Sequence, residues 1–182
     1  MISLKQYAIT LALTKKLREN DSWCGETHLQ KSMFFLESLG NSSLGYNFIL
    51  YKHGPYSFDF HDHLDELKTL GFIDLEYIPP YGPRYKVTGR GEGLIQEQQI
   101  DSDPLNDMIK ATATCLAPKK VKELEQLGTA LLVWKEDQTA PSEARAQRLT
   151  ILKPHITPED ATKATQEFET ILPCFQQHSC HA

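Results

Sequence analysis

The sequence predicts a mainly helical α+β protein, with a winged helix-turn-helix domain over residues 1–100 and a helical part over residues 101–182. Two observations predict this class. The expected elements of the first part follow the order helix, helix, strand, helix, hairpin, helix, which fits the winged variant of the helix-turn-helix domain. After residue 104 the apolar residues recur at helical spacing throughout. The second part would therefore be a bundle of helices that packs on the first part or forms an oligomer interface.

The bulk composition is that of an ordinary globular protein. The chain has 182 residues, of which 40% are hydrophobic and 24% are charged, and its formal net charge is -5. This acidic balance gives no general attraction to nucleic acid or to an anionic membrane. No apolar run approaches the roughly 20 residues of a membrane span, and the first residues lack the layout of a signal peptide. We therefore expect a cytoplasmic protein whose four scattered cysteines are free thiols.

Two helices and a strand are expected at the start of the chain. Residues Ser3–Glu19 carry a broad apolar stripe, which is typical of a central packing element. After a polar break at residues 20–22, Thr27 is expected to cap a second helix over Leu29–Leu39. The short apolar stretch Tyr46–Tyr51 then predicts a strand.

The segment Lys52–Ile73 predicts a turn followed by an amphipathic helix. The turn would be His53-Gly54-Pro55-Tyr56, and the Ser57 hydroxyl would cap the first turn of the helix. Gly71 fits the position just after the helix, where a left-handed residue closes the last turn. The stripe that faces the core would comprise Phe60, Leu64 and Leu67.

The opposite side of this helix is the candidate surface for a protein partner. It comprises Phe58, Asp62, Asp65, Glu66 and Thr69. A helix that enters the major groove normally brings Arg, Lys, Asn or Gln to base edges and phosphates. Carboxylates at this place would be repelled by phosphates, whereas Phe58 has the character of an aromatic anchor at a protein interface. The alternative interpretation is an acidic face that only contacts solvent.

A hairpin and further helices complete the chain. The strands Ile73–Ile78 and Arg84–Val87, joined by a loop rich in Pro and Gly, would form the wing. Thr88 is expected to cap a helix that runs toward Gln98. The remaining helices are predicted over Leu105–Leu116, over Lys119–Trp134, from a Ser142 cap to Leu152, and from a Thr157 cap with Pro158 at the first helical position.

Four segments resemble a family of prokaryotic winged-helix proteins. They are HLQKSMFFL at residues 28–36, YKHGPYS at 51–57, YKVTGRG at 85–91 and LKPHITPED at 152–160. The first three together resemble winged-helix proteins of the YwgA type and are similar to the SocA-like (Panacea) antitoxin domain. The fourth resembles the helical tail of YwgA-type proteins.

The resemblance implies a winged-helix regulatory or interaction domain without catalytic residues. In SocA-like proteins this domain is associated with neutralising or delivering a toxin partner. The helical second half departs from the minimal antitoxin domain. We therefore expect a non-enzymatic, antitoxin-like regulatory protein that binds a protein partner such as a toxin or a defence-system component.

A dimeric DNA-binding regulator is the alternative hypothesis. Basic residues at the wing and near the start of the central helix would contact phosphates, and the helical second half would be the dimer interface. They are Lys52, Arg84, Lys86 and Arg90. Four cations support weak, salt-sensitive binding at most. Ordinary surface charge is the simpler interpretation.

No motif predicts a cofactor, a metal site or a catalytic residue. His53, His61 and His63 lie close in the sequence, but residues two apart on a helix point in different directions. The tail contains zinc-ligand types at Cys174, His178, Cys180 and His181. Their positions within eight residues leave little chain for a tetrahedral shell, so we predict no metal there.

Overall fold

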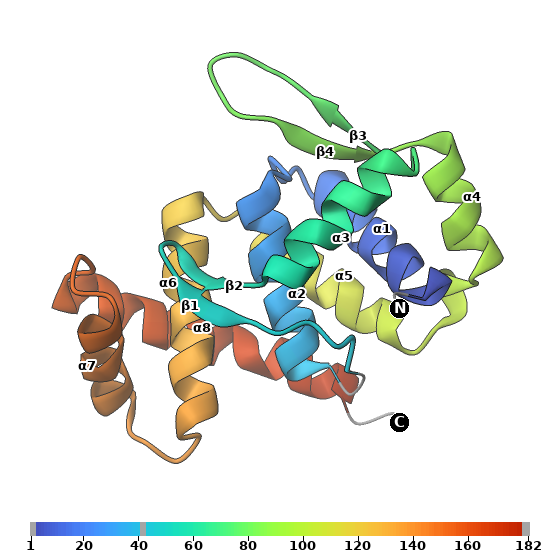
Figure 1. Ribbon diagram of the computed structural model, residues 1–182. Coiled ribbons are helices and arrows are strands. Elements are labelled where there is room, and N and C mark those ends of the chain that lie inside the picture. Colours follow the sequence, from blue (N-terminus) through green and yellow to red (C-terminus); the bar gives the residue numbers. More distant parts are fainter. Residues whose placement is uncertain (1–2, 41–42, 180–182) are drawn as a thin grey trace.

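The computed structural model describes residues 3–40 and 43–179, and in them the protein is a mainly helical α+β fold (Figure 1). The described residues form eight α-helices and two small antiparallel sheets of two strands each. The helices are α1 (Leu4–Glu19), α2 (Glu26–Leu39), α3 (Phe58–Thr69), α4 (Gly89–Glu97), α5 (Leu105–Leu116), α6 (Val121–Glu136), α7 (Ser142–Leu152) and α8 (Pro158–Ser179), with a 3₁₀ turn, η1 (Ile100–Ser102). The strands are β1 (Ile49–Tyr51), β2 (Gly54–Tyr56), β3 (Ile73–Glu76) and β4 (Arg84–Val87).

Helix α1 is the central packing element that its broad apolar stripe predicts. Every residue from Tyr7 to Thr14 is buried, and α2, α4, α5 and β4 pack around the helix. Ser3 caps α1 because its hydroxyl accepts a hydrogen bond from the Gln6 amide at 3.2 Å, and the Gln6 side chain accepts one from the Ser3 amide at 2.7 Å.

Helix α2 begins earlier than predicted, and the expected cap at Thr27 is wrong. The helix starts at Glu26, with Gly25 at the N-cap position and no side-chain cap. The preceding residue, Cys24, has a positive φ of 55°, and its carbonyl accepts a hydrogen bond from the amide of Tyr85 in β4 at 2.8 Å. Since β4 holds the chain at Cys24, the helix begins directly after this point.

The predicted turn at residues 53–56 is also wrong in part, because Gly54–Tyr56 forms strand β2. It pairs antiparallel with β1, and Pro55 lies opposite Leu50. Pro55 made this segment look like a turn, but a proline is tolerated in a short edge strand. Gly54 has a φ of +80°, and a Cβ there would lie 3.1 Å from the Glu125 carbonyl oxygen of α6. The hairpin is therefore pressed closely against α6.

Helix α3 follows the prediction closely. The Ser57 hydroxyl accepts a hydrogen bond from the Phe60 amide at 3.2 Å, and Gly71 has a φ of +71°. The predicted stripe is buried in the core together with one histidine, and comprises Phe60, His63, Leu64 and Leu67. The outward side of α3 is consequently free to contact another molecule.

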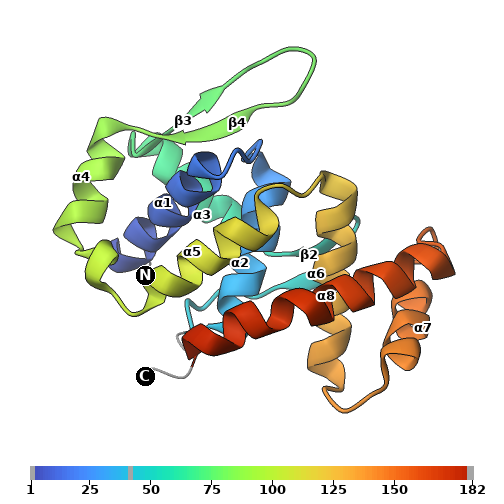
Figure 2. The same ribbon diagram turned by 180° about the vertical axis from the view of Figure 1, so that it is seen from behind.

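Strands β3 and β4 form the predicted hairpin after α3, and it projects from the body (Figures 1 and 2). Thr88 caps α4, since its hydroxyl accepts a hydrogen bond from the Gly91 amide at 3.1 Å. The structure therefore confirms a mainly helical α+β protein. The assignment to the winged helix-turn-helix class stays a prediction.

The later helices pack against the early ones. Helix α5 contacts α1 and α2, α6 contacts α2 and β2, and α8 crosses α5, α6 and α7 (Figure 2). Phe35 of α2 packs against Phe168 and Phe175 of α8, with ring centroids 6.3 and 5.5 Å apart. Ser142 is the first residue of α7 and not its cap, because Pro141 takes that position. In the described residues no helix combines the length and apolarity that crossing a membrane requires.

Candidate functional site

Three aromatic rings meet where β1, β2 and α3 come together, and two of them are exposed. The ring centroids of Tyr51, Tyr56 and Phe58 are 5.1 to 5.7 Å apart in each pair. Tyr51 is 45% exposed and Phe58 is 52% exposed. We call these three residues the aromatic cluster. Contiguous exposed apolar area of this kind is typical of an interaction site.

An acidic surface continues from the aromatic cluster along α3. We call Asp59, Asp62, Asp65 and Glu66, all exposed, the acidic face. Asp65 pairs with Lys68 at 3.1 Å, and Glu66 accepts a hydrogen bond from the Tyr7 hydroxyl. Among the described residues, neither Asp59 nor Asp62 forms an ion pair. Thr69 is exposed too, but its hydroxyl donates to the Asp65 carbonyl at 2.9 Å.

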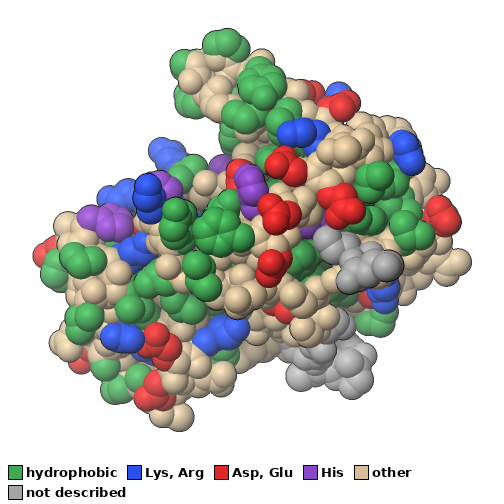
Figure 3. Space-filling view, in the orientation of Figure 1, with side chains coloured by type: hydrophobic (Ala, Val, Ile, Leu, Met, Phe, Trp, Pro, Cys, Tyr) green, Lys and Arg blue, Asp and Glu red, His purple; other side chains and the backbone are tan. Residues whose placement is uncertain are grey.

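Figure 3 shows the arrangement of these groups on one side of the molecule. Hydrophobic side chains gather near the centre of this view, with Asp and Glu mainly to their right and Lys and His mainly to their left. The structure thus places all five predicted surface residues on the exposed side of α3, namely Phe58, Asp62, Asp65, Glu66 and Thr69. The periodicity of the helix was sufficient to identify them, whereas Tyr51 and Tyr56 come from strands and were missed.

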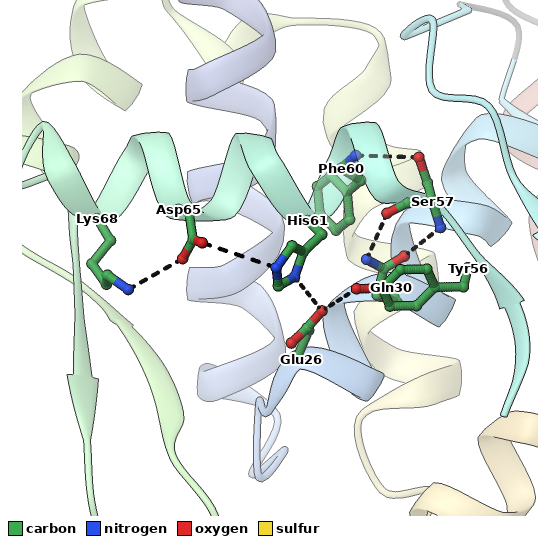
Figure 4. A network of polar contacts seen from close by, with 8 residues as sticks. All are labelled: Glu26, Gln30, Tyr56, Ser57, Phe60, His61, Asp65 and Lys68. Carbon is green, nitrogen blue, oxygen red and sulfur yellow. Dashed lines mark hydrogen bonds and ion pairs between the residues drawn. The ribbon is translucent and has the colours of Figure 1, made fainter. Parts of the chain in front are cut away.

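A polar network joins the aromatic cluster to the start of α2 (Figure 4). One carboxylate oxygen of Glu26 accepts a hydrogen bond from the Tyr56 hydroxyl at 2.9 Å and lies 2.8 Å from Nδ1 of His61. On its other side, Nε2 of His61 lies 3.9 Å from Asp65. Hydrogen bonding to Glu26 raises the pKa of His61, and the nearby carboxylates raise it further.

Gln30 of α2 fixes the start of α3. Its side-chain amide donates to the Ser57 carbonyl at 3.0 Å, and its carbonyl oxygen accepts from the Ser57 amide at 2.9 Å. Gln30 is fully buried, so these two bonds satisfy backbone groups that water does not reach. These two hydrogen bonds fix the position of the aromatic cluster and the acidic face relative to α2 (Figure 4).

Three buried charged residues lie against the β1–β2 hairpin, and two of them bond its backbone carbonyls. They are Lys31, Glu125 and Lys153, which we call the buried charge cluster. The Lys31 ammonium donates to the Pro55 carbonyl at 2.9 Å. The Lys153 ammonium donates to the carbonyls of Tyr51 and Lys52 and lies 3.5 Å from a Glu125 oxygen.

Two exposed histidines complete this arrangement. His155 Nε2 lies 3.1 Å and His53 Nδ1 lies 3.6 Å from the Glu125 carboxylate.

Sequence reasoning missed the buried charge cluster, although one signal was present. Lys31 and Lys153 both stand inside segments of the family resemblance, at residues 28–36 and 152–160.

A hollow of about 230 Å³ opens between the start of α2 and the β1–β2 hairpin. Its lining combines cations, tyrosine rings and the polar side of α2. The residues are Glu26, Thr27, Gln30, Lys31, Tyr51, Lys52, His53 and Tyr56. The hollow therefore shares two of its walls, Tyr51 and Tyr56, with the aromatic cluster.

The four basic residues of the DNA-binding hypothesis do not all contribute to one patch. Arg84 and Lys86 share the Glu76 carboxylate with Arg18, at 3.2, 3.4 and 3.0 Å. These cations, Arg18 above all, hold the pKa of Glu76 below its usual range. Arg90 lies over the Phe72 ring, 4.8 Å from its centroid. Lys52 belongs instead to the turn between β1 and β2, beside α6.

The predicted histidine and tail residues are dispersed. His63 is buried, its Nδ1 lies 3.2 Å from the Tyr46 hydroxyl, and burial lowers its pKa to about 4. Cys174 is exposed on α8, whereas the side chain of His178 and all of Cys180 and His181 lie outside the described residues. No group of three or more His, Cys, Asp or Glu residues in the described part of the chain is placed to hold a metal ion.

Comparison with known proteins adds no identification, because no family model and no curated protein matches the chain. The family resemblance of the four segments stays an expectation.

Proposed function

We propose that this protein is a non-enzymatic, cytoplasmic regulatory protein that binds a protein partner through the aromatic cluster and the acidic face of α3. The observation that supports the proposal is the contact between three aromatic rings, two of them exposed, beside the acidic face. Of its carboxylates, Asp59 and Asp62 form no ion pair among the described residues. Aromatic residues that become buried on association dominate the binding energy of many interfaces. The antitoxin-like role implied by the resemblance agrees with a surface of this kind.

The partner should present a basic surface around an apolar pocket. The acidic face would attract Lys and Arg side chains, which speeds association and selects against acidic partners. The apolar pocket would take the ring of Phe58, which projects from the first turn of α3. This division of roles assigns affinity mainly to the rings and specificity mainly to the carboxylates.

The test is a triple variant, Phe58→Ala, Asp62→Asn and Glu66→Gln. The partner is first identified by affinity purification with crosslinking from the native host, then purified, and its Kd is measured with both proteins. We expect the triple variant to bind at least about 30-fold more weakly, because losing one aromatic anchor alone costs about 2 kcal/mol at many interfaces.

The matched control is the pair Glu143→Gln and Ile151→Ala, which removes one acid and one exposed apolar side chain from α7. This control should bind like the wild type. Unchanged binding by the triple variant, with normal folding by circular dichroism, would count against the proposal.

A winged-helix regulator that binds DNA as a dimer is the second candidate. The observation that favours it is the group of three cations, Arg18, Arg84 and Lys86, around the Glu76 carboxylate at the loop end of strands β3 and β4. Three positive charges against one negative charge leave a local excess of two. A gel-shift assay at low salt with Arg84→Ala plus Lys86→Ala separates the candidates, since phosphate contacts weaken steeply with salt. Absence of any shift for the wild type removes the DNA hypothesis.

A further inference from the structure

The hollow beside the β1–β2 hairpin contains a buried ammonium group. Lys31 is only 2% exposed, and it lines the hollow together with the more accessible Lys52 and His53. A lysine ammonium has three N–H donors, and one of those of Lys31 is used by the Pro55 carbonyl. Burying a charge is costly unless ion pairs and hydrogen bonds compensate it. A further acceptor in the hollow would therefore be stabilised.

The local charge balance also favours an anion. The buried charge cluster contains two ammonium groups, those of Lys31 and Lys153, against the single carboxylate of Glu125. The two exposed histidines, His53 and His155, lie against the same carboxylate. Glu125 thus lies against the Lys153 ammonium and two imidazole rings, and Lys31 does not have a counter-ion to itself.

Glu26 is the one carboxylate that lines the hollow, and it is already engaged. Its oxygen interacts with Tyr56 and His61, outside the buried charge cluster (Figure 4). The remaining polar lining offers donors, in the Thr27 hydroxyl and the Lys52 ammonium. The N-terminus of α2, which has no side-chain cap, adds the positive end of a helix dipole.

The rings of Tyr51 and Tyr56 supply the apolar part of the lining, with centroids 5.7 Å apart. A ligand that matches the whole hollow needs a negative group for Lys31 and a flat apolar body for the tyrosines. We propose that the hollow is a binding site for a carboxylate carried on an aromatic or similarly flat apolar group. The site is separate from the acidic face, although it shares Tyr51 and Tyr56 with the aromatic cluster.

The proposal is tested by titrating the whole protein with phenylacetate and following backbone amide signals by NMR. We expect saturable shifts centred on Thr27, Lys31 and Lys52. Phenylacetamide has nearly the same shape without the charge, and should bind at least about tenfold more weakly, because hydrogen bonds to charged groups are the stronger ones. Equal binding of the two compounds would overturn the proposal, as would no saturable shift up to about 10 mM phenylacetate.

Variants of the lysines show whether the probe occupies this hollow. Lys31→Met keeps an unbranched side chain that is one atom shorter, removes the charge, and should abolish binding of phenylacetate. Lys52→Gln changes only an exposed residue and should weaken binding several-fold, which keeps the test decisive if Lys31→Met fails to fold. Lys68→Gln, on α3 outside the hollow, is the matched control and should bind like the wild type. Full binding by Lys31→Met or Lys52→Gln contradicts the assignment.

The pH dependence provides an independent measurement. Burial lowers the pKa of Lys31 to about 8, and the charges that face it are Glu125 of α6, Lys153 after α7 and Glu26 of its own helix. The Lys31 ammonium loses its proton as the pH rises above this value, so the affinity for phenylacetate should fall between pH 8 and pH 9. Constant affinity over this range would contradict a role for Lys31, since phenylacetate itself stays ionised.

The physiological source of the carboxylate is a free small acid or an acidic side chain of a polypeptide. A capped Phe-Asp dipeptide, whose only carboxylate is the aspartate side chain, distinguishes the two. Tighter binding of the dipeptide than of phenylacetate assigns the hollow to a polypeptide, and the reverse assigns it to a free acid. Failure of both probes overturns the proposal but leaves the partner surface untouched, because Asp62 and Glu66 do not line the hollow.

Discussion

At the scale of single residues, the contacts that determine the surface are made by polar side chains in unusual places. Gln30 is buried within the apolar stretch of α2 and bonds both backbone groups of Ser57. Glu26 links a tyrosine of β2 to a histidine of α3. The buried Gln30 and the half-buried Glu26 thus hold residues of β2 and α3 in position.

His61 should make the stability of the protein depend on pH. The pKa of His61 is raised in the folded state, chiefly by Glu26. Its stabilising contribution is therefore complete below the pKa of the unfolded chain and is lost as the pH rises through the folded pKa. We expect the free energy of unfolding of the wild type to exceed that of His61→Gln at pH 6, and the difference to shrink toward pH 8. Urea unfolding at three pH values measures this difference.

The control for this prediction is Glu26→Gln, which removes the main cause of the shift. In that background the His61→Gln substitution should change stability by nearly the same amount at every pH. If the stability difference between the wild type and His61→Gln grows with pH, the pKa of His61 is not raised in the folded state.

At the scale of elements, the sequence predicted those features that depend on neighbouring residues. Ser57 and Thr88 cap the helices that they were expected to cap, because capping needs only the next few residues. The cap at Thr27 failed because a contact from Tyr85, far along the chain, fixes the residue before α2. Strand β2 was not predicted because Pro55 is typical of a turn. Its strand conformation depends on pairing with β1 and on contact with α6, which the local sequence does not show.

The close approach of the β1–β2 hairpin to α6 can be tested at Gly54. A Cβ at Gly54 would lie 3.1 Å from the Glu125 carbonyl oxygen and 3.3 Å from the Thr129 hydroxyl oxygen. Gly54→Ala should therefore destabilise the protein by more than the roughly 1–2 kcal/mol that a left-handed alanine costs. Chemical denaturation gives the free energy.

Gly71→Ala is the matched control, because Gly71 has a similar φ of +71° with nothing within 4 Å of the added Cβ. The excess cost of Gly54→Ala over Gly71→Ala reports the contact with α6 alone. If the two variants lose the same stability, the hairpin is not pressed against α6 as described.

At the scale of the whole molecule, the buried charge cluster was beyond sequence reasoning. Lys31, Glu125 and Lys153 are far apart in the chain, and a buried charge is favourable only when its partners are brought to it. The helices and the exposed side of α3 could be predicted because they follow a local period. The hollow and its cations could not, because they exist only where α2 and the β1–β2 hairpin meet.

The contacts between early and late helices predict that the protein unfolds as one unit. Phe168 of α8 is fully buried between Phe35 of α2 and Trp134 of α6. Phe168→Ala should cost about 3–5 kcal/mol through lost burial and the cavity left behind. The urea transition should shift equally when followed by tryptophan fluorescence and by far-ultraviolet circular dichroism.

Ile151→Ala, at an exposed position of α7, is the control and should change stability by less than about 0.5 kcal/mol. Two separate transitions for Phe168→Ala would instead support the predicted division into residues 1–100 and 101–182.

The bonds from the Lys153 ammonium to the carbonyls of Tyr51 and Lys52 have a practical consequence for dissecting this molecule. A fragment that stopped before the sixth helix would retain the tyrosines but lose the ammonium that anchors their backbone. Such a truncated piece would display its rings in many orientations. If such a fragment does not bind a ligand or a partner, the cause is that the hairpin is no longer held in place, and the result does not show that the full chain lacks this binding.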